Sequence, residues 1–194
     1  RIKNIFAFTV MICSLCLFCG FLVTEKASAK KTTVKKVSSA LKNGTFTVSG
    51  KGKMPESAMP KAAQKKKIKK IVIKNGVTEL PEDAFRDCSK ATVITIAPTV
   101  NRIGAMAFYN TGVEKITISD EVKYIRENAF NSLLSSTSQK FSIRSVVLNN
   151  NIETLPKYAF AGNKEIKVYT NKEIMIQRYT FDNCGEYEII RLTH

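Results

Sequence analysis

Few side chains in this chain could carry acid–base, nucleophilic or metal chemistry. The single histidine is the last residue, His194, so no Ser/His/Asp or Cys/His arrangement can be built around a second one. The carboxylates Glu82, Asp83 and Glu127 lie beside basic residues, and a glycosidase pair would need two acids about 5 to 10 Å apart in a cleft. No glycine-rich phosphate loop is present. The sequence therefore predicts no enzyme, no cofactor and no metal.

Positive charge is the other chemical feature. The chain has 31 basic and 16 acidic residues, a net charge of +15. A lysine-rich run suggests contact with an anionic polymer, such as wall teichoic acid or an acidic glycan, through Lys65, Lys66, Lys67 and Lys69. The alternative is a solvated segment that keeps the neighbouring structure soluble and blocks edge pairing. Specific nucleic-acid binding is disfavoured, because no aromatic side chains interleave with these lysines.

The N-terminus predicts export. A short positive region (Arg1 and Lys3) precedes an apolar run at residues 5–23, and Ala27-Ser28-Ala29 is a small-residue cleavage site. Residues 1–29 are thus expected to be a signal peptide, and residues 30–40 a flexible basic leader. Cleavage would leave 165 residues with a net charge of +13, secreted or at the cell surface. The alternative is an uncleaved membrane anchor, because the apolar run is just long enough to span a bilayer.

The elements that position these residues follow from a repeat. An Ala-Phe pair ends at Phe85, Phe108, Phe130 and Phe160, with a degenerate Thr-Phe copy at Phe181, so the spacings are 23, 22, 30 and 21 residues. Such a period is the signature of a solenoid of stacked coils. An aliphatic residue precedes each phenylalanine by five positions, and in four copies another precedes it by eight.

Upstream of each pair lies a strand pattern. Isoleucines and valines two positions apart must face the core of a strand, and Ile71, Ile94, Ile116 and Val146 should stack as neighbouring rungs. The short segments before each Ala-Phe pair predict single helical or 3₁₀ turns. The expected fold is an α/β repeat: a solenoid with a parallel β-sheet on one face and short helical turns on the other. We expect an N-terminal β cap and loop at 41–67, then about five coils at 68–194, with an insertion at 131–142 and a degenerate last coil.

Three stretches, residues 68–85, 113–130 and 143–160, resemble the BspA-like leucine-rich repeats of bacterial secreted and cell-surface proteins. Residues 43–55 resemble the segment that often opens such arrays. The resemblance implies a binding or adhesion protein, although a solenoid fold by itself does not fix a function.

Two cysteines, Cys88 and Cys184, each follow a repeat phenylalanine by three residues. They should lie four coils apart, on the order of 19 Å at about 4.8 Å per coil, which is too far for a disulfide. The sequence predicts two buried free thiols.

The outward positions of the strands are the candidate partner-binding face. They show no aromatic or arginine anchor and comprise Lys70, Val72, Lys74, Val93, Thr95, Lys115, Thr117, Ser145, Val147 and Asn149. Solenoids often bind through such a sheet face. We therefore expect a secreted or cell-surface binding or adhesion module for a protein or glycan partner. The alternative function is a polycationic, wall-associated structural protein that binds anionic polymers by charge.

Overall fold

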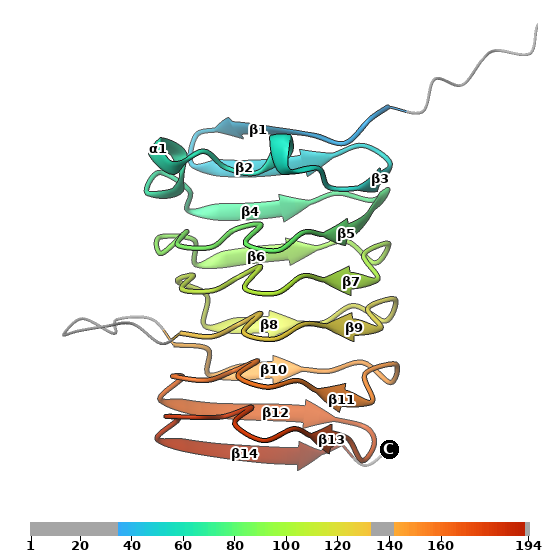
Figure 1. Cartoon of the computed structure of the whole chain (residues 1–194), viewed down its shortest axis with the longest axis vertical. Coiled ribbons are helices and arrows are strands. Elements are labelled where there is room, and N and C mark those ends of the chain that lie inside the picture. The colour runs from blue at the N-terminus through green and yellow to red at the C-terminus, as the bar shows by residue number, and fades with distance from the viewer. Residues whose placement is uncertain (1–34, 133–141, 193–194) are drawn as a thin grey trace, which may run out of the picture. The chain divides into compact units, whose positions relative to one another are not determined.

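The computed structural model describes residues 35–132 and 142–192. The signal peptide expected at 1–29, the first part of the leader and most of the insertion lie outside these residues. Within them, no helix is long and apolar enough to cross a membrane. Successive coils stack from the N-terminal to the C-terminal end of the array (Figure 1).

The front sheet is built from one strand of each coil. An N-terminal hairpin pairs β1 with β2 in antiparallel fashion, and all the later pairings in this sheet are parallel. The strands are ordered β1-β2-β4-β6 in one ladder and β8-β10-β12-β14 in a second. Their bounds are β1 Ser38–Lys42, β2 Thr45–Ser49, β4 Lys70–Ile73, β6 Val93–Ile96, β8 Lys115–Thr117, β10 Ser145–Val147, β12 Glu165–Thr170 and β14 Glu186–Arg191.

A second, return sheet runs along each coil after the front strand. Its short parallel strands are ordered β3-β5-β7-β9, followed by the separate pair β11-β13. Their bounds are β3 Gly52–Lys53, β5 Val77–Leu80, β7 Arg102–Ile103, β9 Tyr124–Ile125, β11 Thr154–Leu155 and β13 Met175–Ile176. The sequence pattern does not predict this sheet, because five of its six strands have only two residues and are too short to show an alternation.

Front and return strands define six coils: β2/β3, β4/β5, β6/β7, β8/β9, β10/β11 and β12/β13, numbered 1 to 6, with β14 after them. The expected count of about five was one short, because coil 1 lacks the Ala-Phe pair. Its strand β2 pairs in parallel with β4, and Phe46 and Val48 are buried like their partners Ile71 and Ile73. The segment expected to be only a cap is therefore itself a coil, covered by β1.

The leader expected at 30–40 overlaps this hairpin. Val37 is buried, and β1 begins at Ser38 and pairs through Ala40 with Thr47 of β2. The loop expected before the repeats contains two short helices, η1 (Glu56–Ala58) and α1 (Ala62–Lys65).

The segments around each Ala-Phe pair form a turn face with little helix. Alternate amides donate to the next coil, as from Phe85 to the Ala107 carbonyl at 2.7 Å and from Phe108 to the Ala129 carbonyl at 2.8 Å. The residue two before each phenylalanine has a positive φ, as at Asp83 (56°) and Asn128 (59°), a conformation that Asp and Asn tolerate well. The positive φ at this position interrupts the run of right-handed residues that the expected helical turn would need.

The core is the column of repeat phenylalanines. Phe85, Phe108, Phe130 and Phe160 are at most 1% exposed, and consecutive rings are stacked with centroids 5.4 Å apart. Phe181 continues the column at 6.0 Å but is half-buried, since it belongs to the last coil described. The predicted rungs are confirmed within each ladder, where Ile71 pairs with Ile94 and Ile116 with Val146.

A buried asparagine fixes the described ends of the insertion. Asn163 is fully buried, and its Oδ1 accepts hydrogen bonds from the Ser132 hydroxyl (2.9 Å) and the Ile143 amide (2.8 Å). Its Nδ2 donates to the Phe160 carbonyl at 2.7 Å and to the Phe130 carbonyl at 3.3 Å. One side chain thus joins the residues on either side of the insertion to coils 4 and 5.

Replacing Phe130 with alanine should lower the free energy of unfolding by about 3 to 5 kcal/mol, because it leaves a cavity in the middle of the ring column. Urea denaturation followed by circular dichroism would measure the loss. Tyr124→Ala is the matched control, since Tyr124 is 62% exposed and should change stability by no more than about 0.5 kcal/mol. Equal midpoints for Phe130→Ala and the wild type would show that the ring column does not stabilise the coils.

Candidate functional site

The front face is the outward side of the front sheet. Its middle column follows the strand register, with Val72 opposite Thr95 in the first ladder and Thr117 opposite Val147 in the second. Most of the predicted face residues are exposed: Lys70, Lys74, Val93, Thr95, Lys115, Thr117 and Val147; Val72 and Ser145 are half-buried. The structure therefore brings these nine residues onto one surface.

Asn149 does not belong to this face. It is only 5% exposed, and its Nδ2 donates to the Ser119 carbonyl and to the Val122 carbonyl. Its Oδ1 accepts from the amides of Asn151 and Ile152 at 2.7 and 3.1 Å. The strand β10 ends at Val147, so the alternation that would point residue 149 outward has already stopped. Asn149 is a buried corner residue that satisfies backbone groups.

The sequence analysis missed the C-terminal extension of the middle column. Tyr169 of β12 pairs with Val147, and Ile190 of β14 pairs with Tyr169, so both continue the column. An aromatic side chain therefore does lie on the front face. The sequence does contain a sign of this strand, because Ile166 and Val168 are spaced as core positions of coil 6. The predicted face comprises outward positions of four coils only and therefore omits Tyr169.

The predicted anionic-polymer residues lie where the chain enters coil 2. Lys65 is the last residue of α1 and is half-buried, whereas Lys66, Lys67 and Lys69 are exposed between α1 and the start of β4. Lys70 of the front face follows directly, so the two candidate surfaces meet at this strand.

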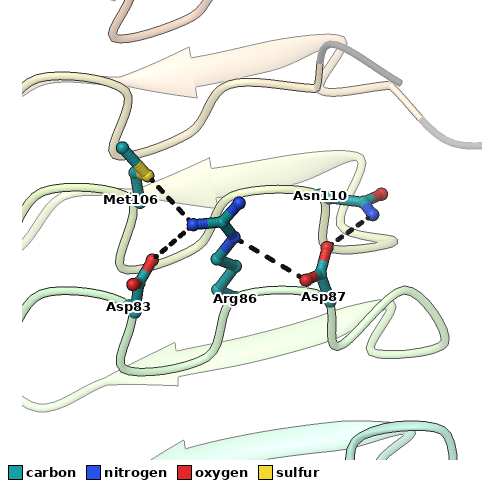
Figure 2. Close-up of polar contacts among 5 residues, drawn as sticks. All are labelled: Asp83, Arg86, Asp87, Met106 and Asn110. Carbon is teal, nitrogen blue, oxygen red and sulfur yellow. Dashed lines mark hydrogen bonds and ion pairs between the residues drawn. The ribbon is translucent and has the colours of Figure 1, made fainter. Parts of the chain in front are cut away.

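Two carboxylates of the turn face, Asp83 and Asp87, belong to a polar cluster that spans two coils. Figure 2 shows Arg86 between two aspartates, with its Nη1 3.3 Å from Asp83 Oδ1 and its Nε 3.7 Å from Asp87 Oδ2. Its Nη1 also lies 3.4 Å from the Met106 sulfur, while Asn110 Nδ2 donates to Asp87 Oδ1 at 2.9 Å. The cluster joins coils 2 and 3 and gives Asp83 a structural role.

A groove interrupts the return sheet between β9 and β11. The equivalent amides of Gly104 and Arg126 each donate at 3.0 Å to the coil before them. In coil 5 this position is Pro156, which has no N–H to donate. The groove between β9 and β11 holds about 480 Å³ and is lined by residues that include Tyr124, Arg126, Asn151, Glu153, Pro156 and Gln177. The groove is open to solvent, and its lining is mostly polar.

The two cysteines behave differently. Both are free thiols, as expected. Burial raises the pKa of Cys88 to about 12, with the nearby Lys65 lowering it and Asp87 raising it by smaller amounts. Burial also raises the pKa of Cys184, but this side chain is only half-buried because it lies in the last coil described. The expectation of two buried thiols is therefore wrong for Cys184. In the described residues, no group of three His, Cys, Asp or Glu side chains could hold a metal ion.

The stacked coils, the parallel front sheet and the turn face define a leucine-rich-repeat solenoid. The family of the BspA type Leucine rich repeat region matches residues 59–188 in six copies. This chain belongs to that family, and the resemblance seen in the sequence is confirmed.

One solved structure supports the fold, and a second is similar only in part. A leucine-rich repeat protein from Eubacterium ventriosum is similar with a TM-score of 0.65 and 23% sequence identity, over 79% of this chain and 42% of that one. A leucine-rich repeat protein from Bacteroides ovatus is similar with a TM-score of 0.47 and 20% identity, over 81% of this chain and 53% of that one. This chain thus spans about half the length of either protein, or less. Among curated proteins, none matches this chain.

Both thiols should react in denaturant without prior reduction when the chain begins at residue 30. In the native protein at pH 8, Cys184 should react with a disulfide reagent faster than Cys88. The reagent reaches a half-buried side chain more easily, and a less buried thiol ionises more readily to the reactive thiolate. Peptide mass spectrometry after timed labelling would measure both rates. A peptide linked through a Cys88–Cys184 disulfide would contradict the coil assignment.

Proposed function

We propose that this chain is a non-catalytic binding module that holds a protein or glycan partner on its front face. The observation that carries the proposal is the middle column, in which outward side chains continue in register through each ladder of the sheet. In order, the column comprises Thr47, Val72 and Thr95 in the first ladder, and Thr117, Val147, Tyr169 and Ile190 in the second.

The chemistry of this column suits contact with a partner. Threonine and valine are short and stiff, so little side-chain entropy is lost when they are covered. Val147 is 38% exposed and Val93 beside the column is 47% exposed, which gives apolar area to bury. Tyr169 supplies an aromatic side chain of the kind that often dominates binding energy.

Lysines flank the column and set its limits. Lys70 and Lys115 are exposed at the start of their strands, and Lys167 pairs with Glu188 at 3.3 Å across β12 and β14. A polar, charged rim around a less polar centre is the usual anatomy of an interface. The partner would therefore contact the middle column and meet charge at the edge.

The absence of catalysis is part of the proposal. Asp83 and Asp87 of the turn face are engaged with Arg86 and Asn110, and the buried Asn149 and Asn163 satisfy backbone groups. Export through the N-terminal segment 1–29 would place the module at the cell surface or in the medium, where a protein or glycan partner is accessible.

The test is a variant in which Val72, Thr95, Thr117 and Val147 are all changed to glutamate. Wild type and variant are applied to arrays of immobilised glycans and purified extracellular matrix proteins in 150 mM salt. We expect at least one array member to bind the wild type. The variant should bind that member with about tenfold or more lower affinity, because charge at the centre of an interface is costly to desolvate.

The control carries the same change in charge at exposed positions outside the column: Asn75, Ser89, Asn150 and Asn171 to glutamate. Its affinity should stay within about twofold of the wild type. Circular dichroism must show both variants folded. Equal retention of the wild type and the column variant, or no retention of the wild type at all, would overturn the proposal.

A further inference from the structure

The positive charge of this protein is confined to one end of the array. Between residues 35 and 74 there are 12 lysines and a single acidic residue, Glu56. From residue 75 to the C-terminus, 14 basic residues are balanced by 14 acidic ones. We call residues 35–74 the lysine end; it comprises the β1–β2 hairpin, the helices η1 and α1, and strand β4.

Three segments bring lysines together at one corner of this end. The amides of Lys69 and Lys70 donate to the carbonyl of Gly44 in the hairpin turn, at 2.8 and 3.1 Å. Lys42 and Lys70 lie in the same row of the sheet, because both are opposite Thr45. In Figure 1, α1, the end of β1 and the starts of β2 and β4 lie at the same corner.

Within the described residues, the lysines of this corner form no ion pair with a carboxylate. Of the lysine-end side chains, the described structure pairs Lys53 with a carboxylate, Glu79, at 3.0 Å; the remaining ion pairs of the described residues involve Arg86, Lys167 and Arg191. Like charges held at one corner repel one another and raise the local positive potential. A ligand that neutralises them therefore gains attraction that the folded chain does not use.

We infer that the corner of the lysine end, formed by the β1–β2 turn, α1 and the start of β4, is a docking site for a linear polymer of phosphodiester groups that lies beside the middle column. Lysine binds phosphate as a point charge and does not require the planar, bidentate geometry through which arginine binds carboxylates and phosphates. The lysine end has no arginine. Mobile ammonium groups from a hairpin turn, a helix end and a strand start can each meet a phosphate along a flexible chain.

A membrane surface fits this end less well. Peripheral membrane binding combines basic residues with apolar side chains that enter the headgroup region. The exposed large hydrophobic residues of the described structure begin at Val93, beyond the lysine end. The same feature disfavours single-stranded nucleic acid, which is bound by stacking on exposed aromatic side chains.

The test changes Lys65, Lys66, Lys67 and Lys69 to glutamine and measures binding to poly(glycerol phosphate) by titration at several salt concentrations. We expect a loss of about tenfold or more at 50 mM salt, together with a shallower dependence of log Kd on log salt, because fewer counterions are released. The matched control removes the same charge from the balanced part of the chain, at Lys123, Lys157, Lys164 and Lys172. It should stay within about threefold of the wild type.

Two comparisons make the outcome decisive. The wild type should bind poly(glycerol phosphate) more tightly than polygalacturonate, which carries carboxylates, and more tightly than vesicles containing phosphatidylglycerol. Equal losses in the two lysine variants would show a response to net charge without a site, and tighter binding to vesicles would assign the end to a membrane; either result overturns the inference. A front-face variant limited to the second ladder, Thr117→Glu with Val147→Glu, should still bind the polymer, so failure here and failure of the proposed partner binding are distinguishable.

Discussion

The column of phenylalanine rings is the constraint on which the rest of the structure depends. Rings stacked 5.4 Å apart require each coil to return to the same place after every repeat. The front ladder is divided between β6 and β8, and the return ladder between β9 and β11. The stacked rings and the hydrogen bonds donated by the turn-face amides cross both junctions. Each junction is therefore held by contacts beyond those of a single sheet.

Features that repeat as large apolar side chains were predictable from the sequence. The valine column at Val77, Val100 and Val122 is fully buried, because burial depends on side-chain size at a fixed spacing. The backbone path of the turn face was not predictable in the same way. Its positive φ values accompany hydrogen bonds between coils, and the sequence shows only hints of them, such as Asp83 and Asn128.

The candidate surfaces show the same division. Outward positions could be assigned wherever a strand was long enough to keep its alternation, and nine of the ten predicted face residues lie on the front face. Asn149 failed because its strand ends two residues earlier. Tyr169 was missed because coil 6 departs from the repeat at its Ala-Phe pair, although its strand keeps the pattern.

The net positive charge and the nearly neutral middle column lie at different places along the array. The middle of the front face is nearly neutral, while the net charge belongs to the first coils. Two kinds of contact can therefore coexist. Apolar contacts at the middle column act at short range, and the longer-range attraction of the lysines, which salt screens, acts at another place. This separation also explains why total charge alone says little about which surface a partner would meet.

The two interrupted ladders also have a mechanical meaning. A load applied along the stack passes through every junction in series, and hydrogen-bonded strands resist separation together when they are pulled apart. The junctions between coils 3 and 4 and between coils 4 and 5 each lack one ladder that the others have. Under tension, opening at the junction between coils 3 and 4 would leave two blocks, and each block would keep one half of the front sheet.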